Sequence, residues 1–174
     1  MAITRLNHAV LYVRNLERSK EFYENVLGFR TIIFMPGQAA FFQASGSTND
    51  HDLGLFEIGE QAAPSGAGRS TVGLYHLAWE VDTLAELARI REVLQDRGAL
   101  VGASDHVTTK ALYAQDPDGI EFEVSWLLPA DCIDDEIRNT LATHGIRPQP
   151  LDIAAEIHRY GADTLGGLGV SLPL

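Results

Sequence analysis

The sequence predicts an α+β fold made of two copies of one strand–helix–strands unit. Two similar segments that each carry a histidine support this prediction: residues 6–15, LNHAVLYVRN, and residues 73–82, GLYHLAWEVD. An offset of 68 residues (76 − 8) places His8 on His76 and Val13 on Val81. A helical pattern follows each segment at once, and self-similarity of this kind indicates a repeated structural unit.

Composition limits the class of protein. The chain has 174 residues and a formal net charge of −11, which argues against nucleic acid and anionic membranes as partners. It contains no apolar run long enough to span a membrane, and its first residues lack the apolar stretch of a signal peptide. Cys132 is the single cysteine, which excludes an internal disulfide and fits a reducing compartment, so we expect a cytoplasmic protein.

The first unit is expected to begin with a strand over residues 4–13, whose alternation places His8 on one face with Val10 and Tyr12. Asn15 is the predicted N-cap of the helix that follows, and Gly28 is the predicted stop. Three strands are expected after it, over residues 29–35, 38–44 and 51–58.

Residues 61–70, rich in Gly, Ala, Ser and Pro, are the predicted linker to the second unit. Thr83 and Glu86 form a predicted capping box, and Gly98 ends the helix. The expected strands of this unit cover residues 99–103, 110–115 and 119–127, and the expected helices beyond Pro129 cover residues 131–143 and 151–160. The predicted domains are therefore 1–128, with modules at about 4–60 and 71–128, and a helical C-terminal extension over 129–174.

The last strand of the second unit places a carboxylate on the face that also carries the histidines. Ile120, Phe122, Val124 and Trp126 must pack under a helix, so Glu123 points the other way, as His8 and His76 do. Ionisable groups on an inward face are costly unless they are paired or bind a metal. Two His and one carboxylate suit Fe(II), and they also suit zinc. The alternative is that each histidine is satisfied by hydrogen bonds, the more common role of a single buried polar residue.

Three stretches carry a family resemblance: LNHAVLYVRNLERSKEFYENVLGF (6–29), GLYHLAWEVDTLAEL (73–87) and GASDHVTTKALYAQDPDGIEFEVSW (102–126). With them the chain resembles the vicinal oxygen chelate superfamily, whose members are built from paired βαβββ modules. That group includes glyoxalase I, extradiol dioxygenases, and fosfomycin and bleomycin resistance proteins. The resemblance implies a half-open, barrel-like sheet around a divalent metal held by His8, His76 and Glu123. It favours Fe(II), with Mn(II), Zn(II) or Ni(II) as alternatives.

Within the superfamily the sequence most resembles single-domain extradiol dioxygenases. His51 stands where that branch carries its acid–base histidine, Tyr113 has the spacing of its active-site tyrosine, and His106 resembles a second pocket histidine. The resemblance implies Fe(II)-dependent ring cleavage of a catechol-type aromatic diol by O₂. We also expect a homodimer or higher homo-oligomer, because an open sheet leaves exposed edges.

Two other functions remain open at this point. A glyoxalase I-like isomerase or lyase would use a fourth ligand, and Glu57 is the candidate. The repeat offset gives Leu55 (123 − 68) as the equivalent of Glu123, so Glu57 lies one side-chain step away, about 6–7 Å along a strand. A two-residue slip or a bulge would bring Glu57 to the metal. The third possibility is a non-enzymatic small-molecule binding or resistance protein.

Overall fold

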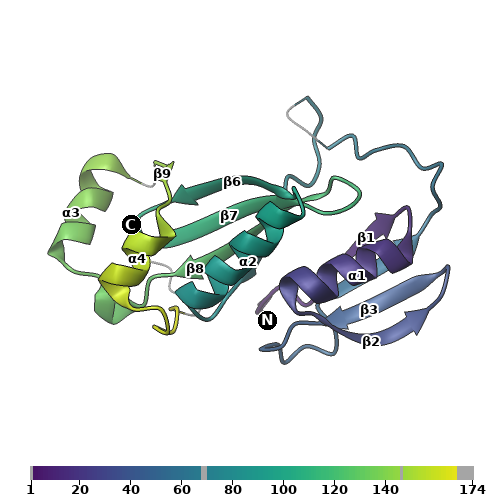
Figure 1. Ribbon diagram of the computed structural model, residues 1–174, viewed down its shortest axis with the longest axis horizontal. Helices are drawn as coiled ribbons and strands as arrows, with labels where there is room; N and C mark the ends of the chain where they lie inside the picture. Colours follow the sequence, from purple (N-terminus) through teal and green to yellow (C-terminus); the bar gives the residue numbers. More distant parts are fainter. Residues whose placement is uncertain (1, 68–69, 146, 168–174) are drawn as a thin grey trace. The chain divides into compact units, whose positions relative to one another are not determined.

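The computed structural model describes residues 2–67, 70–145 and 147–167 (Figure 1). The chain divides into two compact units. Unit 1 comprises Met1–Gly73 with Asp116–Ile120, and unit 2 comprises Leu74–Gln115 with Glu121–Leu174. Each unit contains one copy of the predicted repeat.

Unit 1 is a four-stranded sheet with one helix on one of its faces (Figure 1). Its elements are β1 (Ala9–Val13), α1 (Leu16–Leu27), β2 (Arg30–Met35), β3 (Ala39–Gln43) and β4 (Leu53–Glu57). The strand order is β1-β4-β3-β2, with β1 parallel to β4 and the other neighbours antiparallel. β1 is shorter than the predicted strand over residues 4–13, but its side chains alternate as expected: Leu11 and Val13 are buried, whereas Val10 and Tyr12 are exposed.

The ends of α1 follow local rules that the sequence makes visible. The side chain of Asn15 accepts a hydrogen bond from the Arg18 N–H, and Gly28 ends the helix with a φ of 68°. A left-handed residue at this position is normally glycine, because other side chains crowd the following carbonyl. Both predicted helix ends are therefore confirmed. The buried face of α1 packs onto the sheet through Leu16, Phe22, Tyr23 and Val26.

Unit 2 repeats the same connection. Its elements are β5 (Leu77–Glu80), α2 (Leu84–Asp96), β6 (Leu100–Asp105), β7 (Thr109–Gln115), β8 (Glu121–Leu127) and β9 (Gln149–Pro150), in the sheet order β5-β8-β7-β6-β9. β5 is parallel to β8, as β1 is to β4. Thr83 caps α2 by accepting from the Glu86 N–H, as predicted. The fold is therefore α+β with two equivalent modules, and neither sheet closes on itself.

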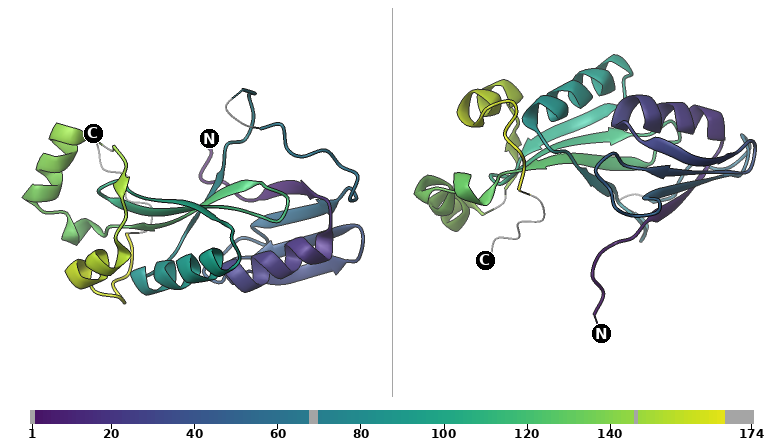
Figure 2. Two further views of the ribbon diagram at one scale, coloured as in Figure 1. Left: turned by 45° about the horizontal axis from the view of Figure 1, so that its top comes forward. Right: turned by 90° about the horizontal axis from the view of Figure 1, so that it is seen from below.

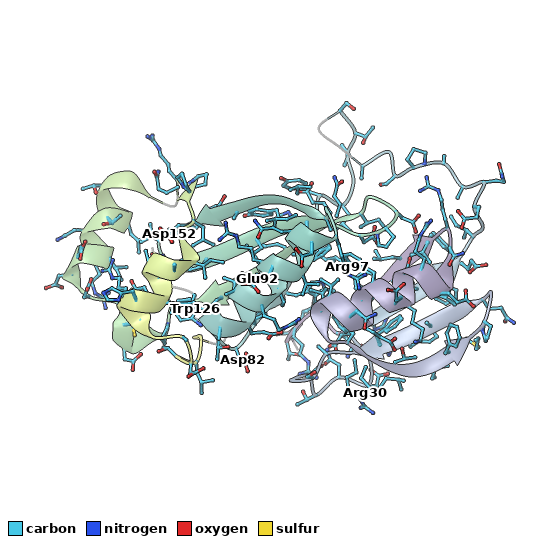
Figure 3. All side chains as sticks on the ribbon, in the orientation of Figure 1. Arg30, Asp82, Glu92, Arg97, Trp126 and Asp152 are labelled. Atoms are coloured by element: carbon cyan, nitrogen blue, oxygen red, sulfur yellow. The ribbon has the colours of Figure 1, made fainter. Side chains whose placement is uncertain are left out.

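The C-terminal extension belongs to unit 2 and contains η1 (Ala130–Cys132), α3 (Asp135–His144) and α4 (Ile153–Tyr160). α4 lies beside α2 (Figure 2), and the Ala162 carbonyl accepts a hydrogen bond from Ala85 N–H in the first turn of α2. The Trp126 ring lies next to α4 (Figure 3), 5.9 Å from the ring of Tyr160. The extension also supplies β9, which the sequence did not predict, and the predicted domain boundary at residue 128 stays a prediction.

Among the described helices, none combines the length and apolar character that crossing a membrane requires.

The turn Asp116–Ile120 joins β7 to β8 and is part of unit 1. The Asp118 carboxylate, 6% exposed, accepts from the Arg14 backbone N–H at 2.9 Å and from the Arg14 guanidinium at 3.1 Å. A third bond comes from Arg18 at 2.9 Å.

The buried Tyr23 donates a hydrogen bond from its hydroxyl group to Asp116 at 3.2 Å. Burial raises the pKa of Tyr23 well above its usual value, so the phenol keeps this proton.

Asp116→Asn should remove a pH-dependent penalty on folding. Burial raises the pKa of the Asp116 carboxyl, although hydrogen bonds from the Ile120 and Asp118 N–H groups oppose the shift. A raised pKa means that the folded protein disfavours the ionised carboxylate. The stability that the fold has with Asp116 protonated is therefore lost as pH rises through the folded pKa. Asparagine keeps an acceptor for the two N–H groups and carries no charge. The stability of the variant relative to the native chain should therefore rise with pH and then level off, in urea titrations from about pH 4 to 7. A relative stability that falls with pH would contradict this account.

Candidate metal centre

A histidine and a carboxylate meet on the sheet of unit 2. His76 directly precedes β5, and Glu123 lies on the adjacent strand β8, where it pairs with Ala78. The Nε2 atom of His76 is 3.2 Å from Oε2 of Glu123. Phe122 and Val124 are buried on the face of β8 toward α2, so Glu123 points to the opposite, open face, as predicted.

The donor atoms of this pair fit a divalent cation. Two ligands bound at right angles with bonds of about 2.0–2.2 Å lie about 3 Å apart, close to the separation of these two atoms. The side chains of His76 and Glu123 are 25% and 13% exposed, so both are partly shielded from water. The other ring nitrogen of His76, Nδ1, is buried and has no hydrogen-bond partner in the part of the chain that the structure describes. The contact with Glu123 is therefore made through Nε2, the nitrogen that would bind a metal at this position.

Two further polar groups stand beside this pair. Tyr113 of β7 lies directly opposite Glu123 in the strand register, and its ring centroid is 5.8 Å from that of His76. Its hydroxyl shares a 3.0 Å hydrogen bond with Nε2 of His106, in the β6–β7 turn. Burial raises the pKa of Tyr113, and the negative charge of Glu123 adds to this effect, so the phenol is held in its neutral form. Four of the six predicted site residues thus form one cluster in unit 2.

The other two predicted residues lie together in unit 1. The rings of His8 and His51 stack with centroids 4.3 Å apart, and His51 meets the Phe41 ring edge-on at 5.2 Å. Nδ1 of His8 is 2.7 Å from the Asn7 side-chain oxygen, which accepts a hydrogen bond from the Nδ1–H group and leaves the lone pair of the ring on Nε2. Nδ1 of His51 is 3.1 Å from the Asp50 carboxylate. His8 is therefore prepared to bind a metal through Nε2.

Within either unit, as far as its residues are described, no three His, Cys, Asp or Glu side chains gather closely enough to hold a metal ion. His8 belongs to unit 1, whereas His76 and Glu123 belong to unit 2. The three-residue ligand set stays a prediction, of which unit 2 contains two members already in contact.

Strand register identifies the residue of unit 1 that corresponds to Glu123. Glu123 pairs with Ala78, and Ala78 corresponds to Val10 by the 68-residue offset (78 − 10). Val10 pairs with Gly54. The structural equivalent of Glu123 is therefore Gly54, and not Leu55, which the sequence offset gave. A shift of one residue along a strand moves a side chain to the other face of the sheet.

Gly54 supplies no side chain that could act as a fourth ligand at this position, and its neighbours pack closely over it. A Cβ atom on Gly54 would lie 3.3 Å from the Phe41 ring and 3.4 Å from Cγ2 of Val10. Phe41 pairs with Gly54 as Tyr113 pairs with Glu123, so the polar pair of unit 2 is replaced in unit 1 by a ring packed over a glycine. The duplicated modules are chemically unequal here.

Glu57 has a different task. It lies in β4 on the face of Leu53 and Leu55, both fully buried, which is the face that α1 covers. Its Oε2 atom accepts a 2.8 Å hydrogen bond from the backbone N–H of Leu16, the first residue of α1. This carboxylate satisfies one of the helix's unpaired N–H groups and interacts favourably with the positive end of the helix dipole.

Glu57→Ala should reduce stability and leave metal binding unchanged. Removing the acceptor of the Leu16 N–H costs about 1 kcal/mol, typical of a lost N-terminal capping contact. The free energy of unfolding from urea titrations and the Fe(II) and Ni(II) affinities from calorimetry check the two parts. A large loss of metal affinity in this variant would instead support a glyoxalase-like site in which Glu57 is a fourth ligand.

Comparison with known proteins adds independent information. The sequence profile of the Glyoxalase/Bleomycin resistance protein/Dioxygenase superfamily matches residues 5–124. A catechol-2,3-dioxygenase of Bacillus subtilis is 36% identical over 124 residues, which cover 70% of this chain. The chain spans 41% of the length of that relative.

Other similar proteins carry different names. A lactoylglutathione lyase of Neisseria meningitidis serogroup A is 29% identical over 135 residues, covering 68% of this chain and 88% of that protein. Among solved structures, a glyoxylase/bleomycin resistance protein/dioxygenase domain from Frankia sp. superposes with a TM-score of 0.60 at 21% identity. That match covers 71% of this chain and 92% of the Frankia chain, and it shows the fold alone.

Proposed function

The chain belongs to the Glyoxalase/Bleomycin resistance protein/Dioxygenase superfamily, and within it we propose that it is an Fe(II)-dependent extradiol dioxygenase acting on a catechol-type aromatic diol. The observation that carries the proposal is the cluster of unit 2. Beside the His76–Glu123 pair stand Tyr113 and His106, joined by a hydrogen bond. Those are two of the residues for which the sequence resembles the extradiol branch. The 36% identity to a catechol-2,3-dioxygenase supports the same reaction class.

Gly54 supports this reaction over that of a lyase with four protein ligands. A carboxylate at the position equivalent to Glu123 is absent, and the nearby Glu57 is engaged with the start of α1. A set of two histidines and one carboxylate would suit Fe(II) and would need no fourth protein ligand.

In the proposed site His8, His76 and Glu123 would hold Fe(II); Mn(II), Zn(II) and Ni(II) are the competing ions. When bound, the iron supplies a template for the diol and O₂ and a route for electrons between them. His51, whose ring centroid lies 4.3 Å from that of His8, would accept a proton from the substrate, a role that histidine commonly takes in catalysis. Tyr113, held neutral, would donate a hydrogen bond to a substrate oxygen, and His106 would orient Tyr113.

The test is direct. Protein loaded with Fe(II) under anaerobic conditions receives catechol or 2,3-dihydroxybiphenyl and then air. We expect oxygen uptake and a yellow ring-opened product. Formation of lactoylglutathione without any oxygen uptake would instead place the protein with the lyases. Absence of both activities, with metal bound, would favour a binding or resistance protein.

The setting of this activity is also part of the proposal. The substrates would be a small aromatic diol and O₂, and the protein would act in the cytoplasm, where a single free cysteine is stable. We further propose a homodimer or higher homo-oligomer.

A further inference from the structure

The turn between β6 and β7 is conformationally unusual. Val107, which follows His106 in this turn, has a φ of 72°, and it is the one non-glycine residue with positive φ in the described ranges. A β-branched residue in this region is strained and persists only where its surroundings hold it. The groups that hold Val107 therefore also determine where His106 points.

Asp105 holds this turn together with the backbone hydrogen bonds that join His106 to Thr108 and Thr109. Its Oδ1 atom accepts a 2.7 Å hydrogen bond from the Val107 N–H. The same oxygen accepts a 2.7 Å bond from the ammonium group of Lys110, which pairs with Asp105 across the β6–β7 ladder. Asp105 can fix the strained residue only while its own side chain is fixed, and Lys110 provides that constraint.

The C-terminal extension completes the network. Lys110 is only 3% exposed, and its Nζ atom lies 3.0 Å from Oε2 of Glu156 in α4, itself 15% exposed. A buried ammonium group needs anionic partners from more than one side, and Asp105 and Glu156 supply them. The extension reaches the turn a second time through β9, where Gln149 pairs with Asp105.

This network and the candidate site occupy opposite faces of the sheet. Lys110 shares the helix-covered face with Trp126, its partner in β8, whereas Tyr113 shares the open face with Glu123. The strained turn connects the two faces. A single run of contacts therefore leads from Glu156 through Lys110, Asp105 and the Val107 N–H to His106, which bonds Tyr113 at 3.0 Å.

We propose that the C-terminal extension positions His106 of the candidate site, with Glu156, Lys110 and Asp105 as the positioning residues. The role of His106 in turnover rests on the proposed function, but its placement does not. The sequence offered one signal for this network, a lone lysine in the otherwise apolar strand LysAlaLeuTyrAla, and that signal does not name the partners of the lysine.

The experiment compares Glu156→Gln with Glu136→Gln. Glu136 lies in the same extension and pairs with Arg159 at 3.2 Å, but it is 76% exposed and outside the network. The first readout is the ring ¹⁵N resonances of His106 in metal-free protein labelled at histidine, assigned with His106→Gln. The second is kcat and KM with catechol after Fe(II) loading.

We expect Glu156→Gln to shift the His106 resonances and to lower kcat about 10-fold with KM almost unchanged, because small misplacements of a catalytic group are costly. Glu136→Gln should change neither. His106 resonances at their native positions in folded Glu156→Gln protein would overturn the proposal. If neither the native protein nor the variants cleave any catechol, the proposed function is wrong. The His106 resonances still test whether the C-terminal extension positions His106.

A double variant keeps the proposal testable if Glu156→Gln does not fold. Lys110→Met with Glu156→Leu replaces the buried ion pair with apolar side chains of similar size, a change that proteins often tolerate. Asp105 then loses Lys110, so the His106 resonances should again be displaced in a folded protein. Native resonances in this variant would also overturn the proposal.

Discussion

Glu123→Ala is expected to weaken Fe(II) binding at the proposed site by at least about 100-fold and to abolish the proposed ring cleavage. Loss of groups that only orient a metal ligand costs about 10–100-fold in metal affinity, so loss of a ligand itself should cost at least as much. Glu123 is also the one carboxylate in contact with His76, at 3.2 Å, among the described residues. Without it, the partly shielded ring of His76 has no carboxylate in contact to help attract a cation. Calorimetric titration with Fe(II) under anaerobic conditions and oxygen uptake with catechol measure the two effects.

Glu121→Ala is the matched control for this prediction. Glu121 lies on the same strand and the same face, two residues before Glu123, but it pairs with Gln115 and not with a cluster residue. The Glu121→Ala variant should retain Fe(II) affinity and activity within about 2-fold of the native protein, because a carboxylate outside the cluster contributes only a screened electrostatic attraction. Equal losses in both variants would mean that the face attracts cations through general negative charge and contains no specific ligand.

Asp118→Ala should lower the stability of unit 1 by about 2–3 kcal/mol, because it removes the anionic partner of the Arg14 guanidinium and the acceptor of the part-buried Arg14 backbone N–H. Asp118 is 6% exposed and Arg14 is 22% exposed, so the lost pair is shielded from water, whereas Arg18 is 43% exposed and contributes less. The backbone N–H of Arg14 adds a further loss, since a part-buried donor that loses its acceptor is left without a hydrogen bond.

Two probes locate the effect of Asp118→Ala. Both tryptophans, Trp79 and Trp126, are in unit 2, so their fluorescence reports that unit, while circular dichroism reports the whole chain. We expect the dichroism transition to move to lower urea. Glu60→Ala is the control, because Glu60 is 58% exposed and 3.9 Å from Arg18, and exposed pairs contribute at most about 1 kcal/mol. An Asp118→Ala variant as stable as this control would show that the buried ion pair has no net effect.

The local rules of the chain were readable from the sequence because they depend on neighbouring residues. Asn15 and Thr83 cap their helices, and Gly28 ends α1, as predicted. The alternation in β8 buries Phe122 and turns Glu123 to the open face, also as predicted. Each of these depends on residues at most four positions apart, or on the two-residue period of a strand.

The candidate site was only partly predictable. Strand alternation placed Glu123 on the face of His76, and the two side chains lie 3.2 Å apart because the β5–β8 pairing belongs to one module; their role as metal ligands stays a prediction. The offset failed for the first module, where it gave Leu55 and the structure has Gly54. An offset taken from one end of a module cannot include differences in loop length further along. An error of one residue then exchanges the two faces of a strand.

By itself, the sequence determined the duplicated strand–helix–strands unit, the family resemblance and the residue types that suit a metal, because periodicity and caps are local properties. Only the tertiary structure decided that Glu57 faces α1, that Gly54 replaces a possible fourth ligand, and that Glu156 reaches Lys110. These facts depend on strand register and on contacts between segments far apart in the chain. Register and such contacts are set by how whole elements pack together, which no short stretch of sequence encodes.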